Sequence, residues 1–161
     1  MILIGLGSNL ASHAGSPKDT LDAALVALQA RGIRTLAVSP YYRSAAWPDP
    51  GDPEFVNAVA QIWTELPPAE LAAILQDVED AFGRTRGRRN APRTLDLDLL
   101  DYNGRVERGP LVLPHPRMST RAFVLVPLRD IAADWHHPVS GQSVDAMIAA
   151  LPAAERGLIR A

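Results

Sequence analysis

An alternating stretch near the middle of the chain places the strongest constraint on its fold. The leucines Leu95, Leu97 and Leu99 alternate with Asp96 and Asp98. This period of two predicts a β-strand with one buried face. Both carboxylates then project from the same side, with their β-carbons about 6–7 Å apart. Two like charges this close repel each other unless a cation lies between them, so the stretch also predicts a divalent-metal site.

The alternative is that the two aspartates form only the solvated face of a strand, which is the commoner explanation of an isolated Asp-x-Asp pair. Here Thr94 extends the polar face, and five arginines fall in the ten residues before it, with no acid among them. These arginines are Arg84, Arg86, Arg88, Arg89 and Arg93. Mg²⁺ prefers one or two carboxylates together with water and substrate phosphates, and guanidinium groups bind phosphate through paired hydrogen bonds. The combination favours a metal–triphosphate site.

The arginine-rich segment has three interpretations: a solvated surface, an RNA-binding surface, or a loop that closes over a polyphosphate. RNA binding usually requires aromatic residues among the basic ones, and none occurs between Gly83 and Thr94. The formal net charge of −2 also argues against a broad nucleic-acid-binding surface.

Length and composition predict one domain over residues 1–161, large enough to bury a core without disulfides. Cysteine is absent, which excludes disulfides and thiolate metal sites and fits a reducing cytoplasm. The first residues lack the basic and long apolar regions of a signal peptide. No apolar run is long enough to span a membrane. We therefore expect a cytoplasmic monomer that binds neither membranes nor nucleic acid.

The first two thirds of the chain predict the element order β-α-β-β-α-β. Ser16 and Pro17 begin the first helix and Gly32 ends it, while Pro67-Pro68 begins the second and Gly83 ends it. The expected strands are residues 1–6, 35–42, 55–63 and 94–102. This order is the split βαβ, ferredoxin-like α+β pattern, with an antiparallel sheet and helices on one face.

The remaining segments are expected to decorate this core as additional C-terminal strands and helices. Asn103-Gly104 predicts a hairpin turn, and residues 111–113 predict a short strand. Irregular segments containing proline follow, before a helix over residues 143–151. The loop over residues 44–53 is long and rich in Pro, Gly and Asp, as functional loops are.

Several other residues have a structural explanation beside a functional one. The segment from Gly5 to Asn9 matches neither phosphate-binding glycine motif, so a turn at the end of a strand is its default interpretation. His115 lies between two prolines, which fix its backbone, although an isolated histidine is more often structural. Phe123 would ordinarily belong to the core, and Asn57 would ordinarily face outward from its strand.

Taken together, these segments resemble the 6-hydroxymethyl-7,8-dihydropterin pyrophosphokinase family of folate synthesis. The most specific blocks are Pro92-Arg93-Thr94-Leu95-Asp96-Leu97-Asp98-Leu99 and Leu113-Pro114-His115-Pro116-Arg117-Met118. Supporting blocks are Gly5-Leu6-Gly7-Ser8-Asn9-Leu10, Tyr42-Arg43-Ser44, Phe55-Val56-Asn57-Ala58, Gly83-Arg84 and Arg121-Ala122-Phe123. They occur in the family's order and cover most of residues 1–130.

The resemblance implies a ferredoxin-like core and transfer of pyrophosphate from ATP to the hydroxymethyl group of the pterin, leaving AMP. ATP would be the co-substrate, and Asp96 and Asp98 would hold two Mg²⁺ ions. The catalytic residues would be Asp96, Asp98, Arg84 and Arg93, the two arginines contacting phosphates during transfer.

The resemblance also implies the two substrate sites. Residues matching ATP-contacting positions are Glu79, Arg84, Arg86, Arg93, His115 and Arg121. Residues matching the pterin site are Ser44, Trp47, Phe55, Asn57 and Phe123, the two phenylalanines enclosing the ring and Asn57 binding its edge. Stacking on two rings suits a flat heteroaromatic, and an amide both donates and accepts hydrogen bonds.

Two positions depart from the family pattern. Asn90 stands where some members carry tryptophan, and Pro110 stands where a basic residue can approach the nucleotide, a role that Arg108 could take instead. Two rival functions also remain open. A nucleotidyltransferase pairs Gly-Ser with Asp-x-Asp, but Ser8 and Asp96 are far apart in this sequence. A ferredoxin-like RNA-binding or ligand-sensing module would leave the aspartate pair unexplained.

Overall fold

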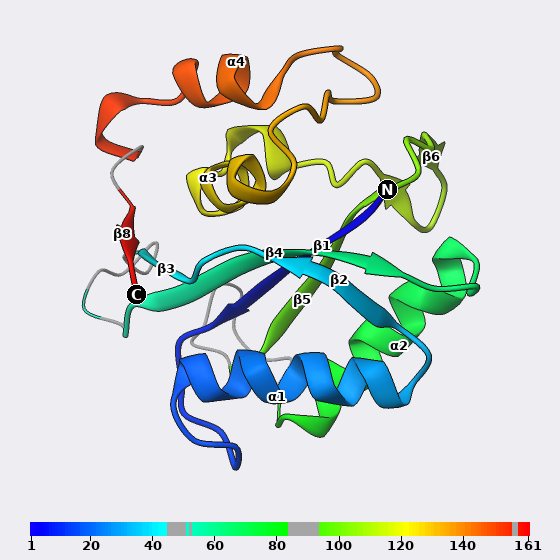
Figure 1. Cartoon of the computed structure of the whole chain (residues 1–161), viewed down its shortest axis with the longest axis vertical. Coiled ribbons are helices and arrows are strands. Elements are labelled where there is room, and N and C mark those ends of the chain that lie inside the picture. Colours follow the sequence, from blue (N-terminus) through cyan, green and yellow to red (C-terminus); the bar gives the residue numbers. More distant parts are fainter. Residues whose placement is uncertain (45–50, 52, 84–93, 156–157) are drawn as a thin grey trace.

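A six-stranded sheet lies at the centre of the computed structural model, which describes residues 1–44, 51, 53–83, 94–155 and 158–161 (Figure 1). Its strands are β1 (Ile2–Ser8), β2 (Arg34–Val38), β3 (Tyr42–Ser44), β4 (Phe55–Trp63), β5 (Asp96–Tyr102) and β8 (Ile159–Arg160). Their order is β5-β1-β4-β3-β8, and β2 also pairs with β4. All of these pairings are antiparallel.

Helices cover both faces of the sheet (Figure 1). The helices α1 (Pro17–Ala30) and α2 (Pro68–Ala81) pack on one face, while α3 (Ala122–Ile131) packs on the other and α4 (Val144–Ala149) packs on α3. Two separate hydrophobic cores result, one beneath each pair of helices. The predicted combination of an antiparallel sheet with helices is confirmed, with the additional C-terminal elements forming the second helical layer.

Strand β1 shows how one segment serves both cores. Ile2, Ile4 and Leu6 point into the core beneath α1 and α2, whereas Leu3 points into the core beneath α3. A strand that is buried on both faces has a nearly continuous run of apolar residues, as β1 has. The strand ends at Ser8, two residues beyond the predicted end, so the Gly5–Ser8 segment is part of the strand rather than a turn.

The first two helices begin and end as the sequence predicts. Ser16 caps α1 in a reciprocal capping box with Asp19, and Gly32 follows the helix with a φ of 82°. Pro67 precedes α2, and Gly83 follows it with a φ of 83°. Positive φ is readily adopted only by glycine, so both glycines end their helices for a backbone reason.

The predicted strand over residues 35–42 is divided in two. β2 ends at Val38 and β3 begins at Tyr42. Pro40 lies in the gap and has no N–H to donate, which interrupts the ladder. Ser39 maintains the connection, because its backbone N–H donates to the Val59 carbonyl and its side chain accepts from the Val59 N–H.

The Asn103-Gly104 turn is present but does not form the predicted hairpin. Both residues have positive φ, 53° and 73°, as a tight turn of this type requires. The following strand β6 (Glu107–Arg108) pairs with β7 (Val112–Leu113) instead of with β5. The predicted short strand at residues 111–113 therefore exists as β7, in a separate two-stranded sheet.

The C-terminal third is more regular than predicted. Helix α3 occupies a segment expected to be irregular, with Pro127 inside it. Its residues Val124 to Leu128 are all buried, because the helix lies between the sheet and α4. Helix α4 is shorter than the predicted 143–151. Two short 3₁₀ helices, Met118–Thr120 and Ala153–Glu155, complete the described elements.

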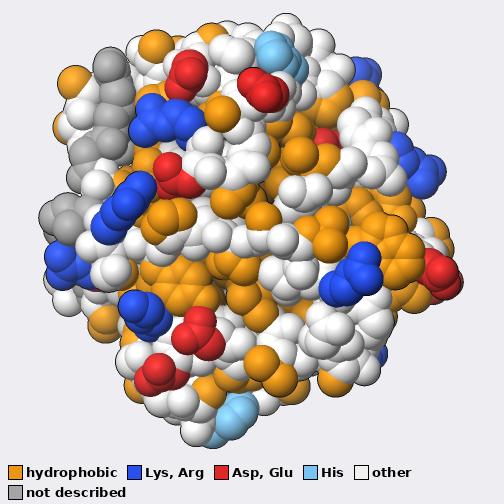
Figure 2. All heavy atoms as spheres, viewed as in Figure 1, with side chains coloured by type: hydrophobic (Ala, Val, Ile, Leu, Met, Phe, Trp, Pro, Cys, Tyr) orange, Lys and Arg blue, Asp and Glu red, His pale blue; other side chains and the backbone are white. Residues whose placement is uncertain are grey.

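The face viewed in Figure 2 carries charged side chains of both signs. On the face viewed in Figure 2, the described Lys and Arg side chains lie among Asp and Glu side chains and apolar patches. Within the described residues, no helix has the length and apolar character that crossing a membrane requires.

Candidate active site

Polar candidate residues form a row across three neighbouring strands. Gly7 of β1 lies opposite Asn57 of β4 on one side and opposite Asp96 of β5 on the other, and Gly5 lies opposite Asp98. Residues opposite each other in antiparallel strands share a face. Asp96, Asp98 and Asn57 therefore lie on the face of the sheet that α3 covers. The two glycines leave that face without side chains between the aspartates and Asn57.

Gly7 is a further candidate residue, one that its sequence pattern alone did not single out. A β-carbon built there would lie 3.0 Å from Asn57 Oδ1 and 3.9 Å from both Asp96 Cβ and Phe55 Cδ1. The position thus needs a residue without a side chain, since three candidate residues approach its backbone. The available signal was the alternation of glycine at positions 5 and 7 in an otherwise apolar strand.

The predicted pterin residues on the sheet come together. Asn57 is only 4% exposed, and its Nδ2 donates a hydrogen bond of 2.8 Å to Ser44 Oγ. Phe55 is half-buried and lies opposite Ser44 in the β3–β4 pairing. Phe123 is half-buried on α3, which packs against β4 and β3. Asn57 points inward, and not outward as its default interpretation predicts.

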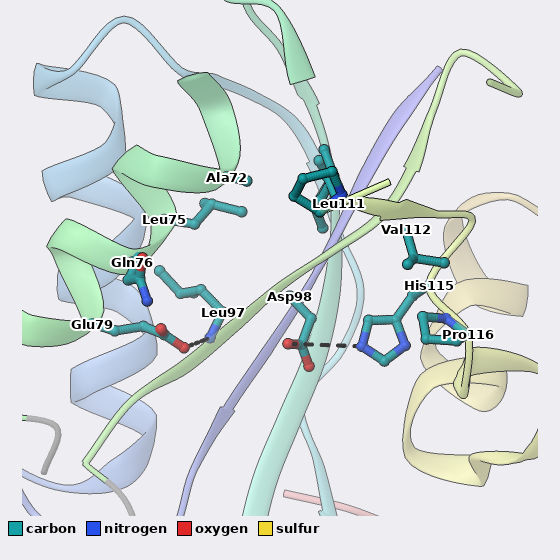
Figure 3. A pocket seen from close by; sticks show the side chains of 12 residues that line it. Ala72, Leu75, Gln76, Glu79, Leu97, Asp98, Leu111, Val112, His115 and Pro116 are labelled. Atoms are coloured by element: carbon teal, nitrogen blue, oxygen red, sulfur yellow. Dashed lines mark hydrogen bonds and ion pairs between the residues drawn. The ribbon is translucent and has the colours of Figure 1, made fainter. Parts of the chain in front are cut away.

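His115 lies close to the second aspartate. Its backbone N–H donates to the Leu100 carbonyl at 2.8 Å, which fixes the segment beside β5. His115 Nε2 is 4.0 Å from Asp98 Oδ1, and the two side chains are 21% and 34% exposed (Figure 3). Burial lowers the pKa of His115 from 6.5 to about 4, helped by the positive charges of Arg121 and Arg117 and opposed by Asp96.

His115 is therefore neutral near pH 7, and its contact with Asp98 is not an ion pair at that pH. The backbone N–H of Arg117 donates to His115 Nδ1 at 3.2 Å, so the proton of the neutral ring resides on Nε2. That N–H is directed toward Asp98 but is too far away for a direct hydrogen bond. It is thus a donor aimed at the space beside the carboxylate.

Arg121 and Phe123 come from one segment at the start of α3. The Arg121 guanidinium carbon lies 5.3 Å from the centre of the Phe123 ring, within the range of a cation–π contact. The positive charge of Arg121 also helps burial to lower the pKa of His115. The start of α3 thus places a cation between the predicted pterin side and the predicted ATP side.

Glu79 of α2 supports the strand that carries both aspartates. Its side chain is 5% exposed, and Oε2 accepts a hydrogen bond of 2.8 Å from the backbone N–H of Leu97. Leu97 lies between Asp96 and Asp98 on β5, which is an edge strand of the sheet. The carboxylate therefore satisfies an N–H that β1 does not reach.

A cavity of about 400 Å³ opens at this edge, between α2 and the segment from Pro110 to Pro116 (Figure 3). This volume falls within the range of small-molecule sites. One part of its lining is apolar, and the other is polar. The apolar side chains include Leu75, Leu97, Leu99, Leu111 and Val112, and the polar ones are Gln76, Glu79, Asp98 and His115. Pro110 is also in the lining, whereas Arg108 is exposed on β6 and is not part of it.

The carboxylate pair suits magnesium. Asp96 and Asp98 are both partly exposed on one face of β5. Among the described residues, no group of three or more histidine and acidic side chains is arranged to hold a metal ion by itself. Mg²⁺ commonly binds through one or two carboxylates and completes its shell with water and phosphate oxygens, so this donor set fits a magnesium–nucleotide complex.

Some of the predicted residues lie outside the described part of the chain. These are Trp47 of the predicted pterin site and Arg84, Arg86 and Arg93 of the predicted phosphate site. Asn90, which departs from the family pattern, also lies outside it.

Comparison with known proteins identifies the family. Residues 3–133 match the family model described as 7,8-dihydro-6-hydroxymethylpterin-pyrophosphokinase (HPPK). The chain belongs to this family. The predicted resemblance is thereby confirmed, and with it an ATP-dependent pyrophosphokinase of folate biosynthesis. HPPK membership decides against the nucleotidyltransferase and RNA-binding alternatives.

Individual HPPK relatives agree over most of the chain. A 2-amino-4-hydroxy-6-hydroxymethyldihydropteridine pyrophosphokinase of Synechocystis sp. is 40% identical over 148 residues, covering 91% of this chain and 73% of the relative. An enzyme of the same name from Pseudomonas aeruginosa is 41% identical over 153 residues, covering 94% of this chain and 91% of the relative.

A solved structure shares the fold. The crystal structure of wild-type HPPK-DHPS from Plasmodium falciparum aligns with a TM-score of 0.67 at 12% identity. The alignment covers 91% of this chain but only 43% of the HPPK-DHPS chain, so this chain spans less than half of that protein.

Proposed function

We propose that this site transfers the pyrophosphoryl group of ATP to the hydroxymethyl group of 6-hydroxymethyl-7,8-dihydropterin, leaving AMP. The observation that carries the proposal is the register of three strands. Gly7 of β1 lies directly between Asp96 of β5 and Asn57 of β4. A carboxylate pair then stands between the β5-edge cavity and the Asn57–Ser44 pair. A phosphate donor on one side and a hydroxyl acceptor on the other could meet there.

The β5-edge cavity is the proposed nucleotide site. Its leucines offer an apolar surface for a base, and its polar side chains offer partners for ribose and phosphate. His115 can donate from Nε2 to a phosphate oxygen without adding a positive charge, and Arg121 adds one nearby. Glu79, Arg84, Arg86 and Arg93 are further proposed ATP contacts, as the family resemblance implies.

Asp96 and Asp98 are the proposed ligands of two Mg²⁺ ions, which would bind together with the triphosphate. Bound magnesium neutralises charge on the phosphate oxygens and holds them in position for transfer. The contribution of the chain is to keep both carboxylates on one face of β5, where the Glu79–Leu97 hydrogen bond supports the strand.

The pterin site is proposed at the Asn57–Ser44 pair. The Asn57 amide can bind the edge of the pterin, with its geometry held by Ser44. Phe55 and Phe123 are the proposed stacking partners of the ring, and Trp47 is a further proposed contact. Stacking between two aromatic rings suits a flat heterocycle.

Pyrophosphoryl transfer needs in-line placement and neutralisation of spreading charge, with little covalent participation by the protein. The proposed mechanism therefore assigns positioning to the strands and helices, and charge stabilisation to Arg84, Arg93 and Arg121. No residue is assigned as a general base.

We also propose a core fold, a domain organisation and an oligomeric state. The spatial order of four strands is β5-β1-β4-β2. Along the chain, α1 follows β1 and α2 follows β4. This arrangement supports a ferredoxin-like core. We also propose a single domain over residues 1–161 that works as a monomer in the cytoplasm. Sedimentation of a dimer would contradict the monomer.

The test is to incubate the purified chain with ATP, Mg²⁺ and 6-hydroxymethyl-7,8-dihydropterin and to identify the nucleotide product. We expect AMP and pterin diphosphate in equal amounts. Asp96→Asn should remain folded and lose at least about a hundredfold in kcat, since the transition-state charge is no longer neutralised. Asp145→Asn, at an exposed position on α4, is the matched control. Formation of ADP in place of AMP would refute the proposal.

A further inference from the structure

A tyrosine two residues before Ser44 connects β3 to α3. Tyr42 is 5% exposed and lies opposite Asn57 in the β3–β4 pairing. Its hydroxyl donates a hydrogen bond to the Asp130 carboxylate on α3. A hydrogen bond to a charged acceptor is stronger than one between neutral groups. The bond therefore ties the strand that carries Ser44 to the helix that carries Phe123.

Strand β8 holds the same tyrosine from its other side. Arg160 lies opposite Tyr42 in the β3–β8 pairing, so β3 is enclosed between β4 and β8 (Figure 1). The Arg160 guanidinium lies 5.8 Å from the Tyr42 ring centre, with Nε 3.4 Å from the Tyr42 hydroxyl. It also lies 3.8 Å from the Asp130 carboxylate. Tyr42, Asp130 and Arg160 form one cluster from three elements.

The position of Asp130 on α3 links this cluster to the proposed pterin site. Phe123 and Asp130 are separated by two helical turns, so they lie on similar sides of α3. Phe123 contributes one wall of the proposed ring site, while Phe55, Asn57 and Ser44 contribute the sheet side. A contact that fixes Asp130 over β3 thus constrains the space between these two sides.

We propose that Tyr42, acting through Asp130 and Arg160, is a positioning residue that sets the separation of α3 from β3 and so the width of the pterin site. This inference rests on the proposed function, because it concerns the substrate assigned to that site. Tyr42 itself need not touch the substrate. Its loss should affect the flat-ring substrate and leave the nucleotide unaffected, since the β5-edge cavity lies on the far side of β1.

The chain contains a matched control in the adjacent residue. The Tyr41 hydroxyl donates to the Asp22 carboxylate, but Asp22 lies on α1, which covers the opposite face of the sheet. Tyr41→Phe and Tyr42→Phe therefore delete the same atom and the same kind of bond from neighbouring positions. Only the second deletion releases α3.

The experiment measures kcat and the KM of each substrate for the wild type, Tyr41→Phe, Tyr42→Phe, Asp130→Asn and the double variant Tyr42→Phe/Asp130→Asn. We expect Tyr42→Phe to raise the pterin KM about tenfold, the size expected for one hydrogen bond to a charged group. The ATP KM should stay within about twofold of the wild type, and Tyr41→Phe should leave both values within that margin. The double variant should resemble the more severe single variant, because both substitutions act on the same Tyr42–Asp130 hydrogen bond: Tyr42→Phe deletes its donor, and Asp130→Asn removes the charge of its acceptor.

The outcomes separate the two proposals. A wild type that makes AMP, with a pterin KM unchanged in Tyr42→Phe, would overturn the positioning role alone. Equal increases in both KM values, or an equal effect of Tyr41→Phe, would overturn it as well, since general destabilisation would then explain the data. A wild type that makes no AMP would overturn the proposed function, and this inference with it.

Discussion

Gly7 illustrates how a residue without a side chain can define a site. It adopts ordinary strand geometry, so its importance comes from the approach of Asn57, Phe55 and Asp96 rather than from backbone strain. An added methyl group would compete with the Asn57 amide oxygen for the same space. The constraint is local and steric, and it concerns the proposed pterin side.

We therefore expect Gly7→Ala to raise the pterin KM about tenfold by displacing the Asn57 amide, with a smaller effect on the ATP KM. Gly5→Ala is the matched control, because the atoms nearest to a β-carbon there belong to the Leu100 side chain, at an ordinary distance of 3.6 Å. Steady-state kinetics with each substrate varied in turn make the comparison. Similar pterin KM values in the two variants would contradict the steric explanation.

A second prediction for a single residue concerns His115 and the pH dependence of stability. Burial lowers its pKa from 6.5 to about 4, so the folded chain disfavours the protonated ring. The contribution of the neutral His115 ring to the unfolding free energy is fully present above pH 6.5. It is lost as the pH falls from 6.5 toward about 4. His115→Gln should consequently show a shallower loss of unfolding free energy over this interval. Urea denaturation at a series of pH values measures it, and parallel curves for the two proteins would be contrary to expectation.

At the scale of elements, the contact between α2 and β5 matters because β5 is an edge strand. Glu79 places a buried carboxylate against the Leu97 N–H, between the two aspartates. A buried carboxylate is costly unless hydrogen bonds compensate it. Here the Glu79 carboxylate is the hydrogen-bond acceptor for a backbone N–H of β5.

Glu79→Ala should lower the unfolding free energy by about 1–3 kcal/mol, because the Leu97 N–H loses its acceptor inside the protein. Glu79→Gln keeps an acceptor oxygen and should recover a large part of that loss. Glu70→Ala, at an exposed position in the first turn of α2, is the control. Urea unfolding provides the three values, and a Glu79→Ala variant as stable as the control would show that the bond contributes nothing.

The sequence predicted some of these helices and strands and missed others. Helices α1 and α2 were predictable because each combines local end signals with an apolar stripe. Helix α3 was not, since Pro127 falls within it and five consecutive residues, Val124 to Leu128, are buried instead of alternating with exposed ones. The division of the strand at Pro40 was visible in principle, but the compensating Ser39–Val59 hydrogen bonds depend on tertiary pairing.

At the scale of the whole molecule, the sheet order brings together residues that are distant in sequence. The Asp96–Asp98 pair was predictable from its alternation, and its partners followed from the family resemblance. The relation of Asp96 to Gly7 and Asn57 was not predictable from local pattern, because it depends on the register of three strands. Residue types thus predict the chemistry, whereas strand pairing determines how the candidate residues are arranged.

The separation of the two hydrophobic cores by the sheet has a consequence for variation in this chain. Substitutions beneath α1, at Leu21 or Leu28 for example, lie on the side away from the Asn57–Gly7–Asp96 row. Such changes bear mainly on how much folded enzyme a cell retains. Changes beneath α3 would bear also on how well each enzyme molecule turns over, as would changes at Leu75, Leu97 and Leu99, which belong to the core beneath α1 and α2 but line the proposed nucleotide site.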